Sequence, residues 1–172
     1  MARLERTVAR RKALQRMATA ACAMLTVASG RAQPASGEHP ALPRIDDLRI
    51  LAAQVRRERI PLLLFFSTPG CPYCNEVRRN YLAPRVKDDA GSLLIREVEI
   101  GSRRRFIGLD GERHTEADFA ARFKVRTVPV VQLVDADLAR LGRPLVGIDA
   151  AGFYEGYLTT AIDGAQRVLR GR

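Results

Sequence analysis

The chain has 172 residues, of which 47% are hydrophobic and 28% are charged. This balance is that of a soluble globular domain, and it excludes a disordered, a collagen-like or a polytopic membrane chain. The formal net charge of +10 raises nucleic acid as a partner. However, residues 1–32 hold seven basic residues and one acidic residue, which leaves 22 basic and 18 acidic residues and a net charge of +4 elsewhere. Because that charge is ordinary for a domain, we expect no nucleic-acid partner.

The N-terminal segment has the three-part pattern of a secretory signal peptide. Residues 1–16 are basic, residues 17–30 (MATAACAMLTVASG) are apolar, and the small residues Gly30 and Ala32 follow. This order predicts a signal peptide over residues 1–32 with cleavage after Ala32. A membrane-spanning helix needs about 20 apolar residues, so a membrane anchor is the weaker alternative. We therefore predict a periplasmic or secreted protein with no stable membrane insertion after the signal is removed.

The rest of the chain is predicted to hold a leader and one domain. Residues 33–43 (QPASGEHPALP) contain three prolines and indicate a flexible leader, and residues 44–172 form the domain. Cys22 is lost with the signal, which leaves Cys71 and Cys74. In an oxidising compartment no further cysteine remains for a structural disulfide, so packing must hold the core.

Apolar patterning predicts that helices and strands alternate along this domain. Residues 62–66 (LLLFF) have no polar alternate, as expected for a strand buried on both faces. The helical segments place apolar residues at helical spacing, and Pro84 predicts a kink or break in the second helix. The predicted elements, in chain order, are a helix over 45–60, a strand over 62–66, a helix over 71–86, a strand over 93–100, a basic loop over 101–114, a helix over 115–123, a strand over 129–134, a strand ending near 146 and a helix of about twenty residues from 149.

Two helix caps are predicted in the second half of the domain. Thr115 and Asp118 fit a capping box at the start of the third helix, with Asp where Glu is preferred. Asp149 is predicted to cap the last helix. The apolar positions of that helix are Phe153, Tyr157, Leu158, Ile162 and Val168.

The motif that points to chemistry is Cys71-Pro72-Tyr73-Cys74, which follows a strand and a turn. Cys71 falls at a helix start, where free backbone N–H groups and the helix dipole stabilise a thiolate. The thiolate is the form that attacks a disulfide, and Cys74, one turn further on, can close a short disulfide and release the partner. Pro72 suits the first helical turn, where its missing N–H costs nothing. We therefore predict a redox-active Cys71–Cys74 pair.

Two other uses of such a cysteine pair are weaker. A zinc site needs a second pair of Cys or His ligands, and the only histidines are His39 and His114. A structural disulfide over a four-residue loop gains little chain entropy. We expect no metal and no dissociable cofactor.

A second feature is Thr127-Val128-Pro129, just before an apolar strand. It lies about 55 residues after the cysteines, where a cis X-Pro bond would bring backbone beside them. Only about 5–6% of X-Pro bonds in folded proteins are cis, so a plain strand-start proline is the alternative on the residues alone.

These two features together resemble the thioredoxin superfamily, over residues 45–168. CPYC and TVP are typical of glutaredoxins. The predicted signal, the leading helix, the STPGCPYCN turn and the DG…T…F segment are similar to secreted bacterial thioredoxin-like proteins, some of which serve sulfur-oxidation systems and others of which maintain periplasmic thiols. The resemblance implies an α/β thioredoxin fold, in which helices flank both faces of a central mixed sheet of at least four strands.

The resemblance also implies roles for individual residues. Cys71 is the expected nucleophile, Cys74 the resolving thiol and Pro129 the cis-proline. The residues expected to shape the site or bind substrate are Pro72, Tyr73, Thr127, Val128 and Pro129.

Two positions depart from the thioredoxin pattern. Gly70 stands where thioredoxins carry Trp, and Phe65 stands where they carry a buried Asp six residues before the first cysteine. The base that helps to deprotonate the resolving thiol is therefore missing. We expect water or a partner group to take the proton of Cys74.

The implied function is thiol–disulfide exchange with client proteins, and a membrane thiol-reductant donor returns the pair to the dithiol. We favour a reductase, and a disulfide-donating oxidase is the first alternative because direction depends on the redox potential. A copper-binding module on the same fold is the second alternative, since two thiolates suit Cu(I). Such modules use a wider cysteine spacing and a later histidine than His114.

The arginine clusters of the domain are expected to be solvated faces, with an acidic protein partner as the alternative. Arg126 differs, because its loop is expected beside Cys71, where it would add positive potential or steer an acidic client. The other clusters are Arg56-Arg57-Arg59, Arg78-Arg79 and Arg103-Arg104-Arg105.

Overall fold

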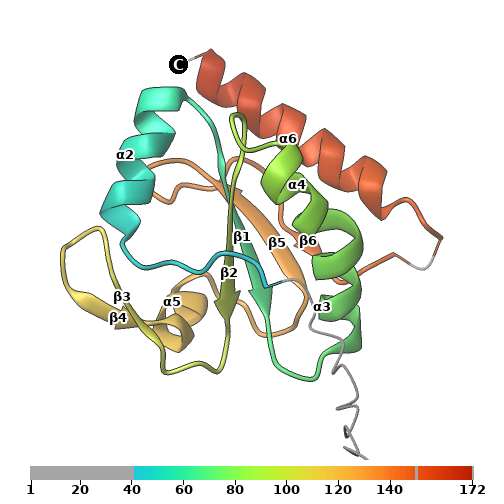
Figure 1. Ribbon diagram of the computed structural model, residues 1–172, viewed down its shortest axis with the longest axis horizontal. Coiled ribbons are helices and arrows are strands. Elements are labelled where there is room, and N and C mark those ends of the chain that lie inside the picture. Colours follow the sequence, from blue (N-terminus) through green and yellow to red (C-terminus); the bar gives the residue numbers. More distant parts are fainter. Residues whose placement is uncertain (1–40, 150, 172) are drawn as a thin grey trace, which may run out of the picture. The chain divides into compact units, whose positions relative to one another are not determined.

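Four strands form a mixed sheet in the order β2–β1–β5–β6 (Figure 1). Strand β1 (Leu62–Ser67) pairs in parallel with β2 (Leu94–Glu99) and antiparallel with β5 (Val130–Val134). The edge strand β6 (Leu145–Val146) pairs antiparallel with β5. This computed structural model describes residues 41–149 and 151–171, so the predicted signal peptide lies outside the described residues.

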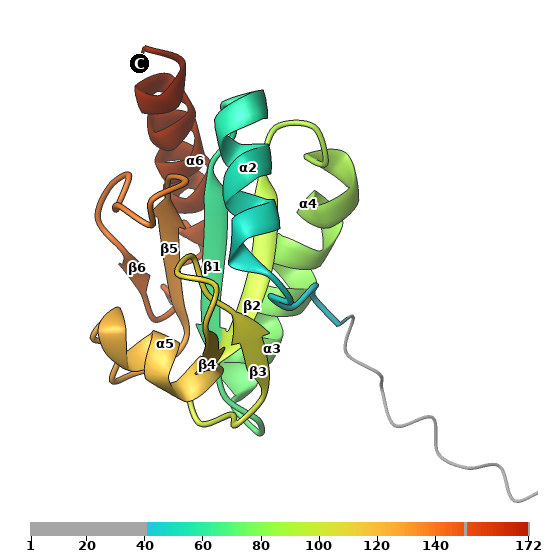
Figure 2. The same ribbon diagram turned by 90° about the vertical axis from the view of Figure 1, so that its left-hand side faces the viewer.

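Helices cover both faces of this sheet, as the α/β prediction requires (Figures 1 and 2). One face is covered by α2 (Leu48–Glu58) and α5 (Glu116–Arg122). The other face is covered by α3 (Pro72–Val77), the π-helical turn η1 (Arg78–Leu82), α4 (Ala83–Asp88) and α6 (Tyr154–Arg170). Among the described residues, no helix is long and apolar enough to cross a bilayer.

Strand β1 builds both halves of the core. All six of its residues are buried. Leu62, Leu64 and Phe66 pack toward α2 and α5, whereas Leu63 and Phe65 pack toward α6 and the helix that follows the cysteines. Because successive side chains of a strand point to opposite faces, a strand between two helical layers needs apolar residues at every position.

The predicted break in the second helix is present as a π-helical turn. The backbone N–H of Ala83 donates to the carbonyl of Arg78, which is a bond five residues back. Pro84 follows in the first turn of α4 and has no N–H to donate. The wider turn of η1 therefore lets the helix continue past a missing hydrogen bond.

The prediction of a loop over residues 101–114 is wrong, because this segment contains a β-hairpin. Strand β3 (Arg105–Ile107) pairs antiparallel with β4 (Arg113–Thr115), and Figure 2 shows the hairpin beside α5 and below α2. Of the six strand residues only Phe106 is buried, so no alternation of apolar and polar residues indicated strands. Thr115 caps α5 as predicted, because its hydroxyl accepts from the N–H of Asp118 at 3.1 Å.

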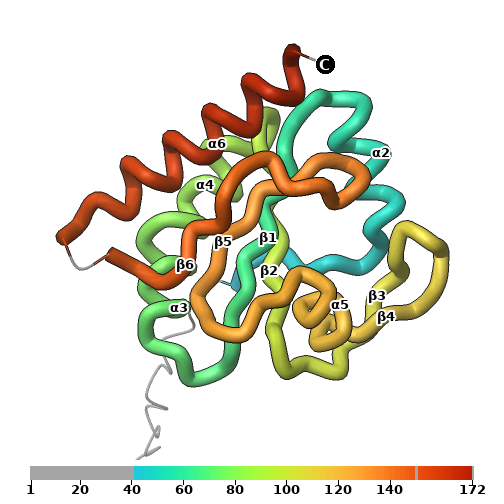
Figure 3. Tube along the Cα trace, turned by 180° about the vertical axis from the view of Figure 1, so that it is seen from behind, coloured from blue at the N-terminus to red at the C-terminus, as the bar shows by residue number. Residues whose placement is uncertain are grey.

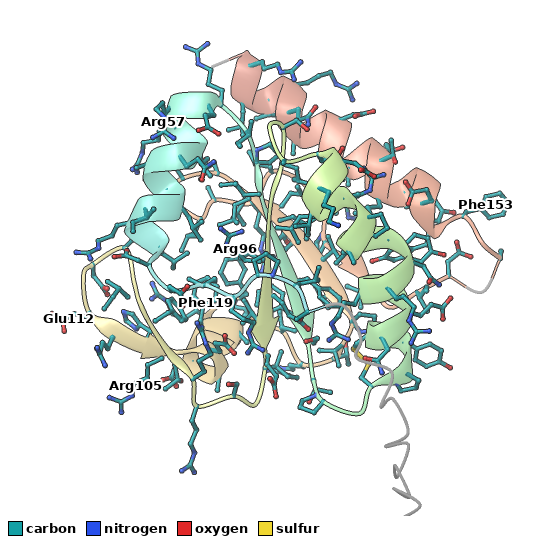
Figure 4. The ribbon with its side chains drawn as sticks, viewed as in Figure 1. Arg57, Arg96, Arg105, Glu112, Phe119 and Phe153 are labelled. Atoms are coloured by element: carbon teal, nitrogen blue, oxygen red, sulfur yellow. A yellow bond between two sulfur atoms is a disulfide. The ribbon has the colours of Figure 1, made fainter. Side chains whose placement is uncertain are left out.

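The last helix begins later than predicted. Its N-cap is Phe153, whereas the Asp149 carboxylate accepts from the N–H of Ala151 at 2.5 Å in the preceding turn. The predicted apolar face was wrong at three positions, since Phe153, Tyr157 and Val168 are exposed, and Figure 4 shows Phe153 pointing away from the fold. The buried face is made of Tyr154, Leu158, Ile162, Ala165 and Leu169.

Leu42 and Pro43, which were predicted to belong to the leader, contact the domain. Leu42 is 4% exposed, and the carbonyl of Pro43 accepts from the N–H of Glu97 at 2.8 Å. Arg44 then donates from Nε to the fully buried carboxylate of Glu116 at 3.0 Å. These contacts attach the end of the predicted leader to β2 and α5.

Candidate active site

The two cysteines lie where β1 turns into α3, at the lower end of the sheet in Figure 1. A disulfide joins Cys71 to Cys74, whose Cα atoms are 5.2 Å apart. Gly70, just before Cys71, has a φ of +74°, a backbone conformation that suits glycine. This turn conformation explains why glycine, and not the tryptophan of thioredoxins, precedes the first cysteine.

The environments of the two sulfur atoms differ. Cys71 is the N-cap of α3, and its Sγ accepts from the backbone N–H of Cys74 at 3.1 Å. The Cys71 side chain is partly exposed, whereas Cys74 is completely buried in the core beside Phe65 and Val77. An attacking group from outside can therefore reach Cys71 and not Cys74.

The predicted proline loop comes to the same end of the sheet. The Val128–Pro129 peptide bond is cis, and β5 begins at the next residue, Val130, which pairs with Phe66 near the end of β1. Val128 and Cys71 both pack against the core cluster that contains Cys74. Fold topology thus brings the two sequence motifs together.

The remaining predicted site residues lie on α3 and in the loop before β5. Pro72 occupies the first turn of α3 and is exposed, and Tyr73 is 59% exposed. Thr127 is exposed, while Pro129 is buried. Arg126 is exposed in the loop just before Thr127, and its expected effect on Cys71 stays a prediction.

Sequence reasoning missed a buried ion pair next to the cysteine helix. Glu97, 5% exposed in the middle of β2, accepts from the Nε of Arg78 at 3.2 Å and also from the hydroxyl of Ser67. Arg78 was predicted to lie on a solvated face, but it points inward and donates to Asn75 Oδ1 at 2.6 Å. In the sequence Glu97-Val98-Glu99-Ile100, charged and apolar residues alternate, which is typical of a strand with its charged side chains in solvent, so no local signal indicated that Glu97 is buried.

This network connects both sides of the cysteine motif. Ser67 ends β1 before the turn, and Asn75 directly follows Cys74. The Arg78 guanidinium also lies 5.7 Å from the ring centroid of Phe65, the residue that stands where thioredoxins carry an acid. The buried charge next to the cysteine helix therefore lies on β2 and η1, and the position on β1 is apolar.

His114, which was considered as a metal ligand, forms a hydrogen bond with Asp110 instead. His114 Nε2 lies 2.8 Å from an Asp110 carboxylate oxygen within the β3–β4 hairpin, and this hydrogen bond lowers the pKa of Asp110. Within residues 41–149 and 151–171, no group of three or more His, Cys, Asp or Glu side chains is arranged to hold a metal ion.

Comparisons with known proteins agree with this geometry. A family described as a thioredoxin-like domain matches residues 50–148, which include both cysteines and the proline loop. No curated protein gave a match. Solved structures also resemble this chain, but at sequence identities of 20% or less, so their similarity shows only a shared fold.

Three similar structures illustrate this likeness. DsbH oxidoreductase is 20% identical over 73% of this chain and 88% of its own, with a TM-score of 0.50. A thioredoxin-fold protein from Helicobacter pylori is 18% identical over 63% and 72%, with a TM-score of 0.49. Mitochondrial thioredoxin 3 from Saccharomyces cerevisiae is 13% identical over 71% and 93%, with a TM-score of 0.48. Since the family match spans more than half of the sequence, the chain belongs to the family of thioredoxin-like domains.

Proposed function

We propose that this protein is a thiol–disulfide oxidoreductase that reduces disulfides of client proteins in the periplasm or outside the cell. The observation that carries the proposal is the contrast between the two cysteines of one disulfide: Cys71 is reachable at a helix start, and Cys74 is buried behind it. The basic, apolar and small segments of residues 1–32 support export.

The reaction begins with the dithiol form. The Cys71 thiolate attacks one sulfur of a client disulfide, and the other client sulfur leaves as a thiolate that takes up a proton. Cys74 then loses its proton and attacks the Cys71 sulfur of the mixed disulfide, which releases the second client thiolate. Two electrons have passed to the client, and the protein holds the Cys71–Cys74 disulfide seen in the structure.

Cys71 is suited to the first step because a donor already points at its sulfur. The N–H of Cys74 lies 3.1 Å from Cys71 Sγ, and the same bond would stabilise a negative charge on that atom. Cys74 has no carboxylate at position 65 to take its proton, because Phe65 is buried there among apolar side chains. Water or a group on the client therefore takes the Cys74 proton.

Each cycle leaves the protein oxidised, so a reductant must restore the dithiol. We assign this role to a membrane thiol-reductant donor, which fits a domain exported into an oxidising compartment. A disulfide-donating oxidase would run the same steps in reverse. The direction is therefore part of the proposal and is tested with it.

The test combines trapping with the redox state in the cell. A Cys74→Ser variant should accumulate mixed disulfides between Cys71 and clients in the periplasm, and the matched Cys71→Ser variant should accumulate none. The unsubstituted protein should be mostly reduced when the donor pathway is intact and oxidised when it is deleted. A pool that stays oxidised in both strains, together with loss of client disulfides after deletion of this protein, would identify an oxidase instead.

A further inference from the structure

Two adjoining hollows lie on the side of the sheet that carries α5. The larger, of about 410 Å³, lies between the β3–β4 hairpin, α2 and α5, and the smaller, of about 280 Å³, lies between α5 and β6. Figure 3 shows these elements around this side of the molecule. Phe123 and Arg140 line both hollows, and Arg140 Nη2 donates to the Phe123 carbonyl at 2.8 Å where they meet. We call the two together the hairpin groove.

One end of the hairpin groove is formed by the loop that precedes the cis-proline. Its smaller hollow is lined by residues 124–127, and the next two residues are Val128 and Pro129. These residues directly precede β5, whose first residue, Val130, pairs with Phe66 near the end of β1, from which the chain turns to Cys71. A segment lying in the groove would therefore end close to the reachable sulfur.

The groove has an apolar floor, and along its rim lie basic side chains that have no ion pair with another described residue. Its floor includes Phe66, Phe119 and Val130, and the edge-strand residue Val146 lines it while remaining 63% exposed. Three exposed cations stand along it, and none of them has an ion pair or side-chain hydrogen bond with another described residue. These cations are Arg122, Lys124 and Arg126.

The acidic residues of the groove are already engaged. Asp110 lies 2.8 Å from His114, and Asp137 lies 2.5 Å from Arg56. Among the described residues, no carboxylate is bonded to the three exposed cations of the rim. A partner that brings carboxylates to such a surface gains attraction on approach and in the complex.

We infer that the hairpin groove docks an acidic, extended segment of a client protein, so that the client disulfide is presented to Cys71; this inference rests on the proposed function. Apolar side chains of the segment fill the two hollows, and its carboxylates lie against Arg122, Lys124 and Arg126. The hairpin that walls the larger hollow thus contributes to the choice of client.

The test uses three peptides that share one internal disulfide and two leucines and differ only in flanking Glu, Gln or Lys residues. The reduced protein should convert the Glu peptide to its dithiol about tenfold faster than the Lys peptide at low salt, with the Gln peptide between them. Near 1 M salt, where screening acts over about 3 Å, the three rates should converge.

The charge of the rim and the apolar floor of the groove are then changed in separate variants. A Lys124→Glu/Arg126→Glu double variant should reverse the order of the peptides, whereas Arg57→Glu, at the far end of α2 in Figure 4, should leave it unchanged. Val146→Asp should slow reduction of the Glu peptide about fivefold. Val168→Asp is the matched control, because Val168 is an exposed valine on α6, which packs on the other face of the sheet.

Binding of the peptides is measured separately from their reduction, so that failure of docking can be distinguished from failure of thiol–disulfide exchange. A second set of peptides, with Ser in place of both Cys, measures binding alone, and the Glu form should bind most tightly and lose affinity in the double variant. Equal rates and equal binding for all three peptides would overturn the groove while leaving the exchange function standing. Failure to reduce any peptide would instead overturn the exchange function and, with it, the role of the groove in client choice.

Discussion

Arg78 and Glu97 form an ion pair that fastens the helix of the two cysteines to strand β2. Their side chains are 12% and 7% exposed, and a second bond joins Arg78 Nε to Glu97 Oε2 at 3.2 Å. Glu97 also accepts from Ser67 before the turn, and Arg78 donates to Asn75 after Cys74. The pair therefore holds the start of the cysteine turn and the helix behind it in one fixed arrangement.

A Glu97→Gln substitution should destabilise the protein by about 3 kcal/mol, because it removes the negative charge that balances the largely buried Arg78 guanidinium. Denaturant unfolding of the oxidised protein measures this change. Asp137→Asn is the matched control, since the Arg56–Asp137 pair is exposed on both sides and should change stability little. A Glu97→Gln variant as stable as the control would show that the pair has no structural role.

The reduced protein should show two thiols of unequal reactivity. The Cys71 side chain receives the N–H of Cys74 and is partly exposed, so its pKa should lie below that of the buried Cys74. Alkylation rate against pH, with modified cysteines identified by mass spectrometry, measures both. If Cys74 reacted first, the roles of attacking and resolving thiol would have to be exchanged.

Reduction of the Cys71–Cys74 disulfide should leave the domain folded. The bond closes a loop between residues only three apart in sequence, and the chain-entropy model gives about 2 kcal/mol for such a loop. Apart from Cys74, the buried members of both core clusters are residues that take no part in this bond. Circular dichroism and denaturant unfolding with and without reductant should show the same secondary structure and at most a change of that size. Unfolding on reduction would mean that the disulfide is structural.

Prediction from the sequence succeeded where the signal is local. The uniform apolar run of β1 requires helices on both faces, and the cysteine motif at a helix start was visible in a few consecutive residues. It failed where the structure depends on distant partners. Glu97 is buried because Arg78, nineteen residues away, accompanies it, and the hairpin forms although its strands carry charged residues.

The sequence also did not predict which aromatic residues of the last helix are buried. Its apolar content was predicted, but Phe153 and Tyr157 are exposed while Tyr154 is buried against Tyr81, with ring centroids 4.9 Å apart. Burial raises the pKa of Tyr154. Of the three aromatic residues only Tyr154 faces the core, and the predicted cap, Asp149, lies four residues before the observed N-cap, Phe153.

Two substitutions on α6 should distinguish its buried and exposed faces. Leu158 is completely buried in the core cluster that also contains Cys74, so Leu158→Ala should cost about 2–5 kcal/mol of stability. Val168 is 44% exposed, and Val168→Ala should change stability by about 0.5 kcal/mol or less. Thermal or denaturant unfolding compares the two. Similar losses for both variants would contradict the orientation of this helix.

Asp47, the N-cap of α2, should make a pH-dependent contribution to the free energy of unfolding. Asp47 caps this helix by accepting from the N–H of Arg49 at 2.8 Å, and its carboxylate also accepts from Arg49 Nη2 at 2.6 Å. These bonds, of which the side-chain bond from Arg49 is the largest cause, lower the pKa of Asp47 to about 2. A carboxylate whose pKa is lowered in the folded state stabilises that state above its unfolded pKa of about 4. The stabilisation is lost as the pH falls through about 2.

The gap in unfolding free energy between the unsubstituted protein and Asp47→Ala should therefore be constant above about pH 5 and shrink between about pH 4 and pH 2. Other titrating groups are common to both proteins and cancel in the difference. Asp47→Asn is the matched control, because it keeps an oxygen acceptor for the Arg49 N–H and carries no titrating charge. Its gap to Asp47→Ala should not change with pH. Urea unfolding at a series of pH values measures all three proteins, and a gap between the unsubstituted protein and Asp47→Ala that persists unchanged at pH 2 would show that the ionised carboxylate does not stabilise this helix.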